Sequence, residues 1–242
     1  VDRAVAAARR AFDEGPWRRM ERRERGRLLV RIGAAIRAHR AELATLVALE
    51  NGKLYREAYE DDMPDTADVF DYYAGWVDKL HGETLPVGPG FLNYTLREPV
   101  GVCALIVPWN YPLLLAAWKM APALAMGNTV LVKPSPETPY AIVRLFEILT
   151  EAVDLPPGVG GLLQAAAAVG EALAGHAAVD KVAFTGSTAV GRLVVEGAAR
   201  SNLKTVSLEL GGKSPNVVFE DLPDLDFALE RSFQLAFSQK GE

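Results

Sequence analysis

The chain has 242 residues, of which 50% are hydrophobic, and its formal net charge at pH 7 is -5. A chain of this length can bury a substantial core, as one large domain or as two smaller ones. Nucleic acids and anionic membranes bind proteins through an excess of Lys and Arg, so the acidic balance argues against both as partners. The composition is typical of a globular enzyme that acts on a small molecule.

The single cysteine, Cys103, excludes an internal disulfide framework and a zinc site built from several thiolates. It suits a reducing compartment, and we expect the cytoplasm. No stretch approaches the ~20 uninterrupted apolar residues of a transmembrane helix. The first residues, VDRAVAAARRAF, predict an amphipathic helix rather than a signal peptide, and without an initiator Met the start of the chain is expected to be a truncation.

The first 80 residues predict a helical segment. Their apolar residues recur at three- and four-residue spacing, which predicts helices near 1–14, 18–50 and 55–80. Gly15-Pro16 and Asn51-Gly52 interrupt the pattern and are expected to separate these helices.

An arginine-rich run between Arg18 and Arg31 allows two interpretations. It could form a basic patch for a polyanion, or it could form the solvated face of a helix whose other side is apolar. Interleaved Glu21 and Glu24, followed by apolar residues at helical spacing, favour the solvated helix face.

Two changes of pattern follow. Between residues 81 and 100, ETLPV and FLNYTLREP are separated by Pro and Gly, which predicts a protruding β-hairpin. Beyond it, the strand-like runs VGVCALIVP, NTVLVKP, GGLLQ, KVAFTG, TVSLEL and NVVFE alternate with helical segments. This order predicts an α/β fold with a Rossmann-like parallel sheet and helices on both faces, in which ligands bind beyond the carboxyl ends of the strands.

The first of these strands ends in PWNYP, a stiff turn that places the Asn110 carboxamide beside the expected ligand crevice. An Asn held there can donate two N–H hydrogen bonds, which is what stabilises an oxyanion forming on a carbonyl oxygen. The alternative is that Asn110 only caps the next helix.

The next two strand ends are suited to a nucleotide. The second strand presents Lys133, whose plausible partner is a ribose hydroxyl or a phosphate; the alternative is a solvated lysine. KVAFTG leads into Gly186, Ser187 and a helix, where glycine permits close approach and free backbone N–H groups attract a phosphate. The alternative is a plain helix cap, since the spacing is not G-x-G-x-x-G.

Glu209 lies within the apolar run TVSLEL. Burial of a carboxylate disfavours its charged form, so its pKa is expected to rise toward the range useful for a general base. The alternative is a structural Glu paired with a Lys. Cys103, inside GVCALIVP, is expected to be an inert core thiol whose pKa is raised by apolar surroundings.

Five motifs in this order, PWN-x-P, AWK-x-APAL, G-N-T-V-x-K-P, FTGST-x-VG and LELGGKSP, resemble the aldehyde dehydrogenase superfamily, and the resemblance spans essentially the whole chain. It implies that Asn110 holds the aldehyde oxygen, that Lys119 lies near the same site, and that Glu209 activates the water that hydrolyses a thioester. It implies NAD as cofactor, with NADP possible. The residues it implies in cofactor binding are Ile106, Val107, Pro108, Trp109, Lys133, Ser135, Pro136, Phe184, Gly186, Ser187, Thr188, Val190, Gly191, Leu210 and Gly211.

The implied reaction is oxidation of an aldehyde to a carboxylic acid, by thiolate attack, hydride transfer to NAD(P) and hydrolysis. The resemblance places the nucleophilic cysteine just after Gly241-Glu242, about two positions beyond the end of the chain. The chain alone is therefore expected to be inactive. A non-catalytic relative that only binds a dinucleotide is the alternative, and a generic nucleotide-binding protein is disfavoured by the joint motifs.

Two departures from the resemblance concern the cofactor. Members that prefer NAD often carry Glu three residues after the strand-end lysine, where this chain has Pro136 with Glu137 next to it; NAD is only slightly favoured. Residues 160–168, GGLLQAAAA, replace a Gly-x-Gly turn beside the adenine. Alanine does not readily adopt positive φ, so this turn is expected to differ and adenine binding to weaken.

The expected organisation has four parts: N-terminal helices over 1–80, a hairpin serving as an oligomerisation arm over 81–100, an NAD(P)-binding domain over 101–211, and the start of an incomplete catalytic domain over 212–242. The resemblance implies a homodimer or homotetramer for the full-length enzyme. YPLLLAAWK resembles members that act on betaine aldehyde or related aminoaldehydes, but aliphatic and aromatic aldehydes stay open.

Overall fold

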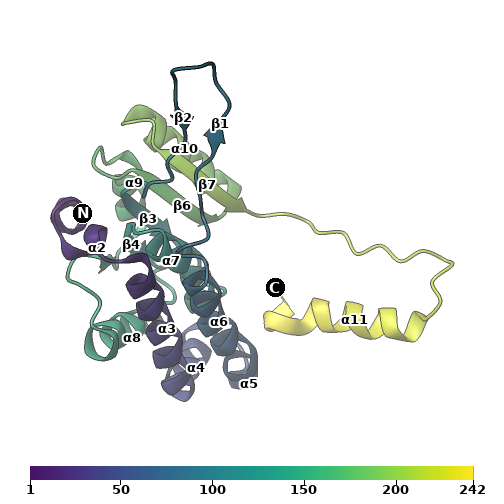
Figure 1. The fold of residues 1–242 in the computed structure, drawn as a ribbon. Helices are drawn as coiled ribbons and strands as arrows, with labels where there is room; N and C mark the ends of the chain where they lie inside the picture. The colour runs from purple at the N-terminus through teal and green to yellow at the C-terminus, as the bar shows by residue number, and fades with distance from the viewer. Residues whose placement is uncertain (242) are drawn as a thin grey trace.

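The computed structural model describes residues 1–241, and its centre is a five-stranded, all-parallel sheet (Figure 1). The strands are β3 (Val102–Ile106), β4 (Thr129–Lys133), β5 (Gly160–Leu162), β6 (Lys181–Gly186) and β7 (Thr205–Leu210), in the order β5-β4-β3-β6-β7. The chain moves outward from β3 to β5 and then returns to add β6 and β7 on the other side of β3. The strand order therefore reverses between β3 and β6, where an open parallel sheet has its ligand crevice.

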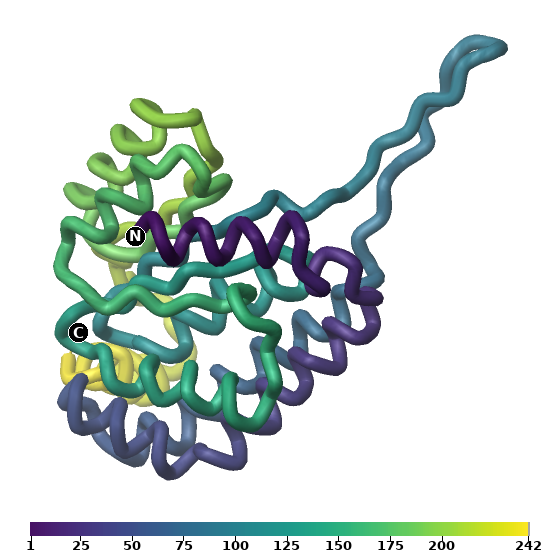
Figure 2. Tube along the Cα trace, turned by 90° about the vertical axis from the view of Figure 1, so that its left-hand side faces the viewer, coloured from purple at the N-terminus to yellow at the C-terminus, as the bar shows by residue number. Residues whose placement is uncertain are grey.

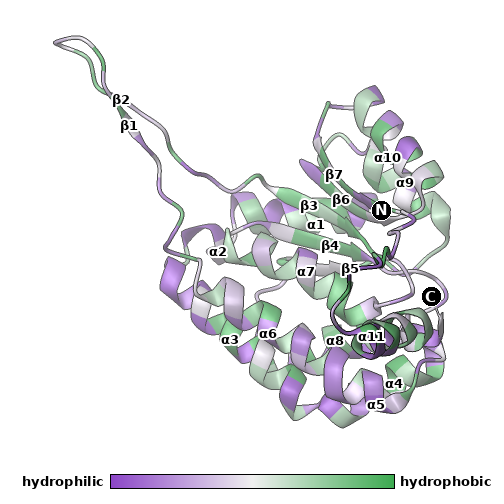
Figure 3. Ribbon diagram, turned by 90° about the vertical axis from the view of Figure 1, so that its right-hand side faces the viewer, coloured by the Kyte–Doolittle hydropathy of each residue, from purple (hydrophilic) through white to green (hydrophobic). Residues whose placement is uncertain are grey.

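Helices cover both faces of this sheet, as predicted. α1 (Asp2–Asp13), α9 (Ala167–Gly175) and α10 (Thr188–Arg200) share a core with Val102, Ala104 and Ile106. α7 (Pro112–Ala125) and α8 (Tyr140–Ile148, extended by the π turn Leu149–Val153) share the opposite core with Cys103 and Leu105. Successive side chains of a strand point to opposite faces, so β3, buried along its whole length, contributes to both cores. Figure 3 shows the apolar colour of these central strands.

The N-terminal helices are more divided than the periodicity predicts. The expected helix over 18–50 consists of α2 (Pro16–Arg19), α3 (Arg22–Ala38) and α4 (Arg40–Asn51), with a break at His39. The expected helix over 55–80 is α5 (Tyr55–Glu57), a π turn (Ala58–Asp62) and α6 (Met63–Ala74), which ends early. α3 packs along α6, and α6 packs along α7, so tertiary contacts rather than local periodicity set these boundaries.

The arginine-rich run forms a helix face, as favoured, with one exception. The apolar residues Leu28, Leu29 and Ile32 are buried on α3. Arg25 is also buried, and it donates hydrogen bonds to the carbonyl oxygens of Ala125 (3.4 Å) and Met20 (2.9 Å).

The hairpin is present as predicted. β1 (Thr84–Leu85) pairs with β2 (Asn93–Tyr94) in an antiparallel register that sets Thr84 opposite Tyr94. Its residues are exposed, and the hairpin projects away from the rest of the chain (Figure 2).

Residues 211–241 differ from expectation. The strand predicted at NVVFE is wrong: Val217 and Phe219 lie in an exposed, irregular segment that leaves the sheet (Figure 1). A strand must pair its backbone N–H and C=O groups, and no described strand pairs with this segment. α11 (Leu225–Phe237) and a short 3-10 turn (Ser238–Gly241) follow, and no residue of α11 is buried. None of the described helices has the length and apolar character needed to cross a membrane.

Candidate active site

Three expected cofactor residues lie side by side across the centre of the sheet. In the strand register, Ile106 at the end of β3 is opposite Lys133 of β4 on one side and Phe184 of β6 on the other. The loops that leave these strands therefore open at one edge, at the point where the strand order reverses. Val107 continues the pairing, because its N–H donates to the Lys133 carbonyl (3.1 Å).

The turn that carries Asn110 is held by its backbone. Asn51, at the end of α4, donates from Nδ2 to the carbonyl oxygens of Trp109 (2.6 Å) and Asn110 (3.2 Å). The Asn110 Oδ1 atom is buried and has no hydrogen-bond partner among the described residues. The N-cap of α7 is Tyr111, without a side-chain capping bond, so Asn110 does not cap that helix. The backbone of Asn110 is therefore held in place, and its carboxamide is available to a ligand.

The end of β4 is buried rather than solvated. Lys133 is 6% exposed, and burial lowers the pKa of its ammonium group, an effect that neighbouring Glu137 partly offsets. Ser135 donates a hydrogen bond to the Glu137 carboxylate, which lowers the pKa of Glu137. Pro136 is exposed. The solvated alternative for Lys133 is thus wrong, and this loop combines a desolvated cation with a carboxylate.

Close packing determines where the β6–α10 turn needs glycine. A Cβ on Gly186 would lie 2.6 Å from the ring of Phe184, and one on Gly191 would lie 2.7 Å from a Leu210 methyl group. Ser187 is the N-cap of α10, and its Oγ accepts from the Val190 N–H (3.3 Å). The capping alternative is therefore correct for the Ser187 hydroxyl, and the other N–H groups of that first turn have no partner within the helix.

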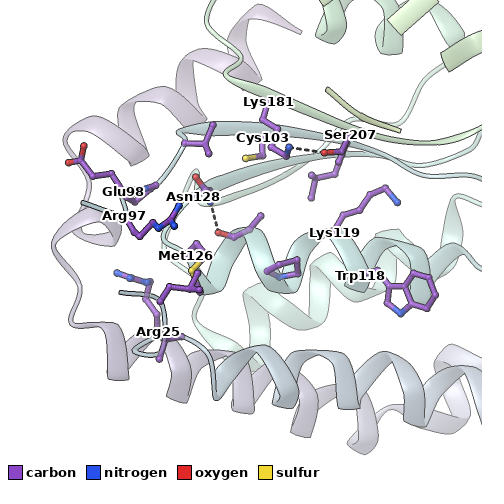
Figure 4. A pocket seen from close by; sticks show the side chains of 18 of the residues that line it. Arg25, Arg97, Glu98, Cys103, Trp118, Lys119, Met126, Asn128, Lys181 and Ser207 are labelled. Atoms are coloured by element: carbon purple, nitrogen blue, oxygen red, sulfur yellow. Dashed lines mark hydrogen bonds between the residues drawn. The ribbon is translucent and has the colours of Figure 1, made fainter. Parts of the chain in front are cut away.

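A cavity of about 680 Å³ lies on the α7 side of the sheet (Figure 4). Lys119 of α7 donates from Nζ to Thr185 Oγ1 (2.7 Å), and the strand register sets Thr185 opposite Glu209. Burial lowers the pKa of Lys119 to about 8, although Glu209 favours the charged form. The cavity thus brings together two of the three expected catalytic residues, Lys119 and Glu209, and is also lined by Phe184; Asn110 is not among its lining residues.

Glu209 departs from its predicted environment. It is exposed rather than buried, because β7 is an edge strand and the irregular segment after it turns away from the sheet. No described residue forms an ion pair with Glu209, so the structural-pair alternative does not hold either. Gly211 is likewise exposed and Leu210 is half-buried.

Cys103 is the core thiol expected. It is 2% exposed, and burial raises its pKa to about 12. Among the described residues, no group of three or more His, Cys, Asp or Glu side chains could hold a metal ion.

The Ala-rich segment after β5 takes ordinary backbone conformations. Ala166, before α9, has φ -62° and ψ 177°, and none of Ala165–Ala168 has a positive φ. This segment therefore does not form a turn of the glycine-dependent kind, as expected from its alanines.

Sequence reasoning missed two residues here. The sequence marks Thr185 only as part of the FTGST motif, whereas the fold sets it opposite Glu209 in the β6–β7 register and within hydrogen-bond distance of Lys119 on α7. Asn51 was treated only as a helix stop. The sequence identifies Asn51 as a residue that ends a helix. Its side-chain hydrogen-bond partners lie far along the chain and are known only from the fold.

The comparisons with known proteins agree with this geometry. The family model described as "Aldehyde dehydrogenase family" matches residues 1–242. Retinal dehydrogenase 2 of Homo sapiens is 49% identical over 244 residues, which cover 100% of this chain and 47% of that protein. The mitochondrial aldehyde dehydrogenase of Sus scrofa is 50% identical and covers 99% of this chain and 46% of that protein.

A solved structure shows the same arrangement. The NAD+ complex of an aldehyde dehydrogenase from Bacillus cereus superposes with a TM-score of 0.96 and 44% identity, covering 99% of this chain and 48% of that one. The present chain thus spans about half the length of the curated relatives that it matches. On these matches, the chain belongs to the aldehyde dehydrogenase family.

Proposed function

We propose that this chain is the N-terminal, cofactor-binding half of an NAD(P)-dependent aldehyde dehydrogenase whose nucleophilic cysteine lies outside it. The observation that carries the proposal is the alignment of Lys133, Ile106 and Phe184 across the reversal of strand order. A dinucleotide laid across these strand ends meets a cation, an apolar floor and the N-terminus of α10 in succession.

The residues fit NAD in detail. Lys133 would contact the adenosine ribose, and Gly186 with Ser187 would face the pyrophosphate at the start of α10. The carboxylate of Glu137 stands beside Lys133, where it would repel a 2′-phosphate. This charge favours NAD over NADP and replaces the acidic residue that the family often carries at the position of Pro136.

The proposed reaction uses three residues of this chain in different roles: Asn110, Lys119 and Glu209. A cysteine thiolate adds to the aldehyde carbon, and the Asn110 carboxamide donates to the oxyanion that forms. NAD, held at Lys133 and the β6–α10 turn, would supply the hydride acceptor, and loss of hydride from the thiohemiacetal would leave an acyl thioester. Glu209 takes a proton from the water that attacks this thioester, releasing the carboxylic acid and the thiol. Lys119, desolvated in the same cavity, adds positive potential near Glu209.

Calorimetric titration of this chain with NAD and with NADP tests the cofactor proposal. Saturable binding of NAD, weakened at least tenfold by Lys133→Met, is expected. Met keeps most of the aliphatic stem, so the variant removes chiefly the charge. Equal affinity of the variant and the original chain contradicts the assignment of Lys133.

The alternative is a non-catalytic relative that only binds the dinucleotide. The two hypotheses differ in the residues that follow Glu242, where the enzyme requires a cysteine. Reading the next codons of the gene decides between them.

A second cavity bears on the aldehyde. A cleft of about 550 Å³ is lined by Asp65, Asp68, Tyr72, Tyr73 and Trp118, together with two aliphatic residues, and Trp118 also lines the larger cavity. Arg37 pairs with Asp68, whereas Asp65 has no ion-pair partner among the described residues. Carboxylates and aromatic faces together attract cations, so we propose an aldehyde with a positively charged end, such as an aminoaldehyde.

This substrate class is testable in the complete protein with a matched pair of aldehydes. Betaine aldehyde carries a trimethylammonium group, and 3,3-dimethylbutanal has the same shape without the charge. Asp65→Asn is expected to raise KM for the charged aldehyde roughly 5- to 10-fold and to leave the neutral one unchanged. Glu171→Gln on α9, behind the sheet, removes one charge as the control. Equal effects on both aldehydes contradict the proposal.

We also propose that the projecting hairpin joins subunits of a homodimer or homotetramer. We further propose that residues 212–242 begin a catalytic domain and that the protein works in the cytoplasm. The exposed hairpin supports the subunit contact, and the exposed apolar side chains of α11 support a further domain that would cover them. The single thiol, which is buried and forms no disulfide, supports a reducing compartment. Size measurements of the complete protein with and without residues 83–96 test the first, since deletion of the arm is expected to yield monomers.

A further inference from the structure

We propose that Asn51 is a positioning residue for the oxidation reaction, one that fixes the Asn110 turn relative to the segment that leads to the nucleophile. The proposal rests on the proposed function, because it assigns Asn51 a role in that reaction. Asn51 is the last residue of α4, on the helical N-terminal part of the chain rather than on the sheet.

The side chain of Asn51 uses both ends of its amide. Its Nδ2 donates to the carbonyl oxygens of Trp109 (2.6 Å) and Asn110 (3.2 Å). Its Oδ1 accepts from Lys240 Nζ (2.6 Å), and its backbone carbonyl accepts from the same ammonium group (3.1 Å). One residue therefore links two segments that are far apart along the chain.

Lys240 makes a further contact with the same turn. Its Nζ lies 4.8 Å from the centre of the Trp109 ring, within the range of a cation–π interaction. Under the proposed function, the nucleophile follows shortly after Gly241. The distance between the nucleophile and the Asn110 carboxamide then depends on Asn51, which touches the chain on both sides.

The residues after Asn51 make this anchor rigid. Gly52 takes a left-handed conformation (φ 79°), which ends α4 without the steric cost that other residues pay there. The Lys53 side chain is fully buried, pairs with Asp62 (2.5 Å) and places its Nζ 4.1 Å from the ring centre of Tyr111. Asn51 and Lys53 together hold three successive residues of the turn, 109–111.

None of these contacts engages the part of Asn110 that the reaction needs. Asn51 binds the backbone carbonyl of Asn110, while no hydrogen bond among the described residues engages its side-chain Nδ2, the atom that would donate to the oxyanion, or its buried Oδ1. The contacts thus orient the carboxamide and leave it free. Since misplacement of a reacting group by 1 Å can cost about 10²-fold in rate, loss of the anchor should affect catalysis more than binding.

The test uses Asn51→Ala in the complete protein, with Asn202→Ala as the matched control. Asn202 Nδ2 also donates to two backbone carbonyls, those of Ala177 (2.8 Å) and Val179 (3.0 Å), on the other side of the sheet. Asn51→Ala is expected to lower kcat roughly 10- to 100-fold with the Kd for NAD changed less than twofold. Asn202→Ala is expected to lower stability by a similar amount and to leave kcat unchanged.

A second variant separates the two halves of the contact. Asn51→Asp keeps an acceptor for Lys240 but sets a carboxylate against the carbonyl oxygens of residues 109 and 110. It is expected to be at least as slow as Asn51→Ala. Activity equal to that of the unmodified protein in Asn51→Asp, or an equal fall in kcat in Asn202→Ala, overturns the proposal.

Hydrogen exchange gives a readout that does not depend on turnover. Asn51→Ala is expected to speed exchange of the amides of residues 109–111 in this chain, whereas Asn202→Ala is not. Unchanged exchange in Asn51→Ala overturns the role of Asn51. Faster exchange in Asn51→Ala, combined with an unmodified complete protein that fails to oxidise aldehydes, keeps the anchoring contact but overturns the proposed function, so the two failures are distinguishable.

Discussion

The two sides of the central sheet differ in how far the chain completes them. At the end of β4, Lys133 is 6% exposed and is surrounded by groups of this chain. At the end of β7, Glu209 is exposed, and the segment that follows turns away from it. The proposed cofactor contacts therefore receive their environment from residues 1–210, whereas the proposed general base does not. Cofactor binding can be tested on this chain, whereas under the proposed function the chemistry is tested on the complete protein.

The largest expected effect concerns turnover. This chain should produce no NADH from propanal and NAD, because its one thiol, Cys103, is buried in a strand and burial raises the pKa of that thiol to about 12, which keeps it protonated and unreactive. In the complete protein, Glu209→Gln should lower kcat roughly 10²- to 10⁴-fold, the usual contribution of a general base. Absorbance at 340 nm measures both. Steady NADH production by this chain alone would contradict the conclusion that the chain completes the cofactor contacts but not the catalytic side of the sheet.

The next effect concerns stability beneath the Asn110 turn. Lys53→Met leaves the buried Asp62 carboxylate without its partner, which should lower the free energy of unfolding by ~3–5 kcal/mol. Urea denaturation of this chain measures it. The double variant Lys53→Met/Asp62→Leu removes both charges and should recover most of the loss. A single variant as stable as the original chain would show that this ion pair does not hold the turn.

A smaller effect is expected at the cofactor loop. Glu137→Ala removes the carboxylate beside Lys133, so binding of NADP should tighten roughly 5- to 10-fold while binding of NAD does not improve. Glu14→Ala, at the C-terminal end of α1, removes the same charge and should change neither affinity. If NADP gains nothing from Glu137→Ala, Glu137 does not select the cofactor.

The same contrast explains what the sequence could and could not predict. The periods of the apolar residues and the βαβα order predicted all five strands of the parallel sheet, and KVAFTG and TVSLEL match β6 and β7 residue for residue. The strand at NVVFE failed, because an apolar run becomes a strand only where a neighbour pairs its backbone. The prediction that Glu209 is buried was wrong for a similar reason, because no described strand or helix covers β7 on its outer edge. Both errors concern residues whose surroundings are not set by their own segment.

The helical part shows the complementary limit. Local spacing predicted helices but not the break at His39, because packing among α3, α6 and α7 fixes the boundaries there. Asn51-Gly52 was correctly predicted as a helix end, and in the structure Gly52 takes the left-handed conformation (φ 79°) that favours glycine. The partners of the Asn51 side chain, at residues 109, 110 and 240, lie too far along the chain for any local pattern to indicate them.

The smallest effect is a pH dependence at Lys119. Burial lowers the pKa of Lys119 to about 8 in the folded chain, whereas an unfolded lysine titrates near 10.5. Between these two values the unfolded chain binds more protons than the folded chain does, so this group makes the folded state more stable as pH rises. Below pH 8 both states are protonated, and the cost of burying the charge is present in full.

Urea denaturation of the original chain and of Lys119→Met, at intervals from pH 7 to pH 10.5, measures this contribution. Lys133 and Lys204, whose pKa values burial also lowers, are present in both proteins, so their contributions cancel in the difference between them. The original chain should gain stability relative to the variant above pH 8. If the difference in unfolding free energy between the two proteins does not change with pH, water or the Glu209 carboxylate keeps Lys119 charged. The environment of Lys119 would then resemble the exposed end of β7 rather than the buried end of β4.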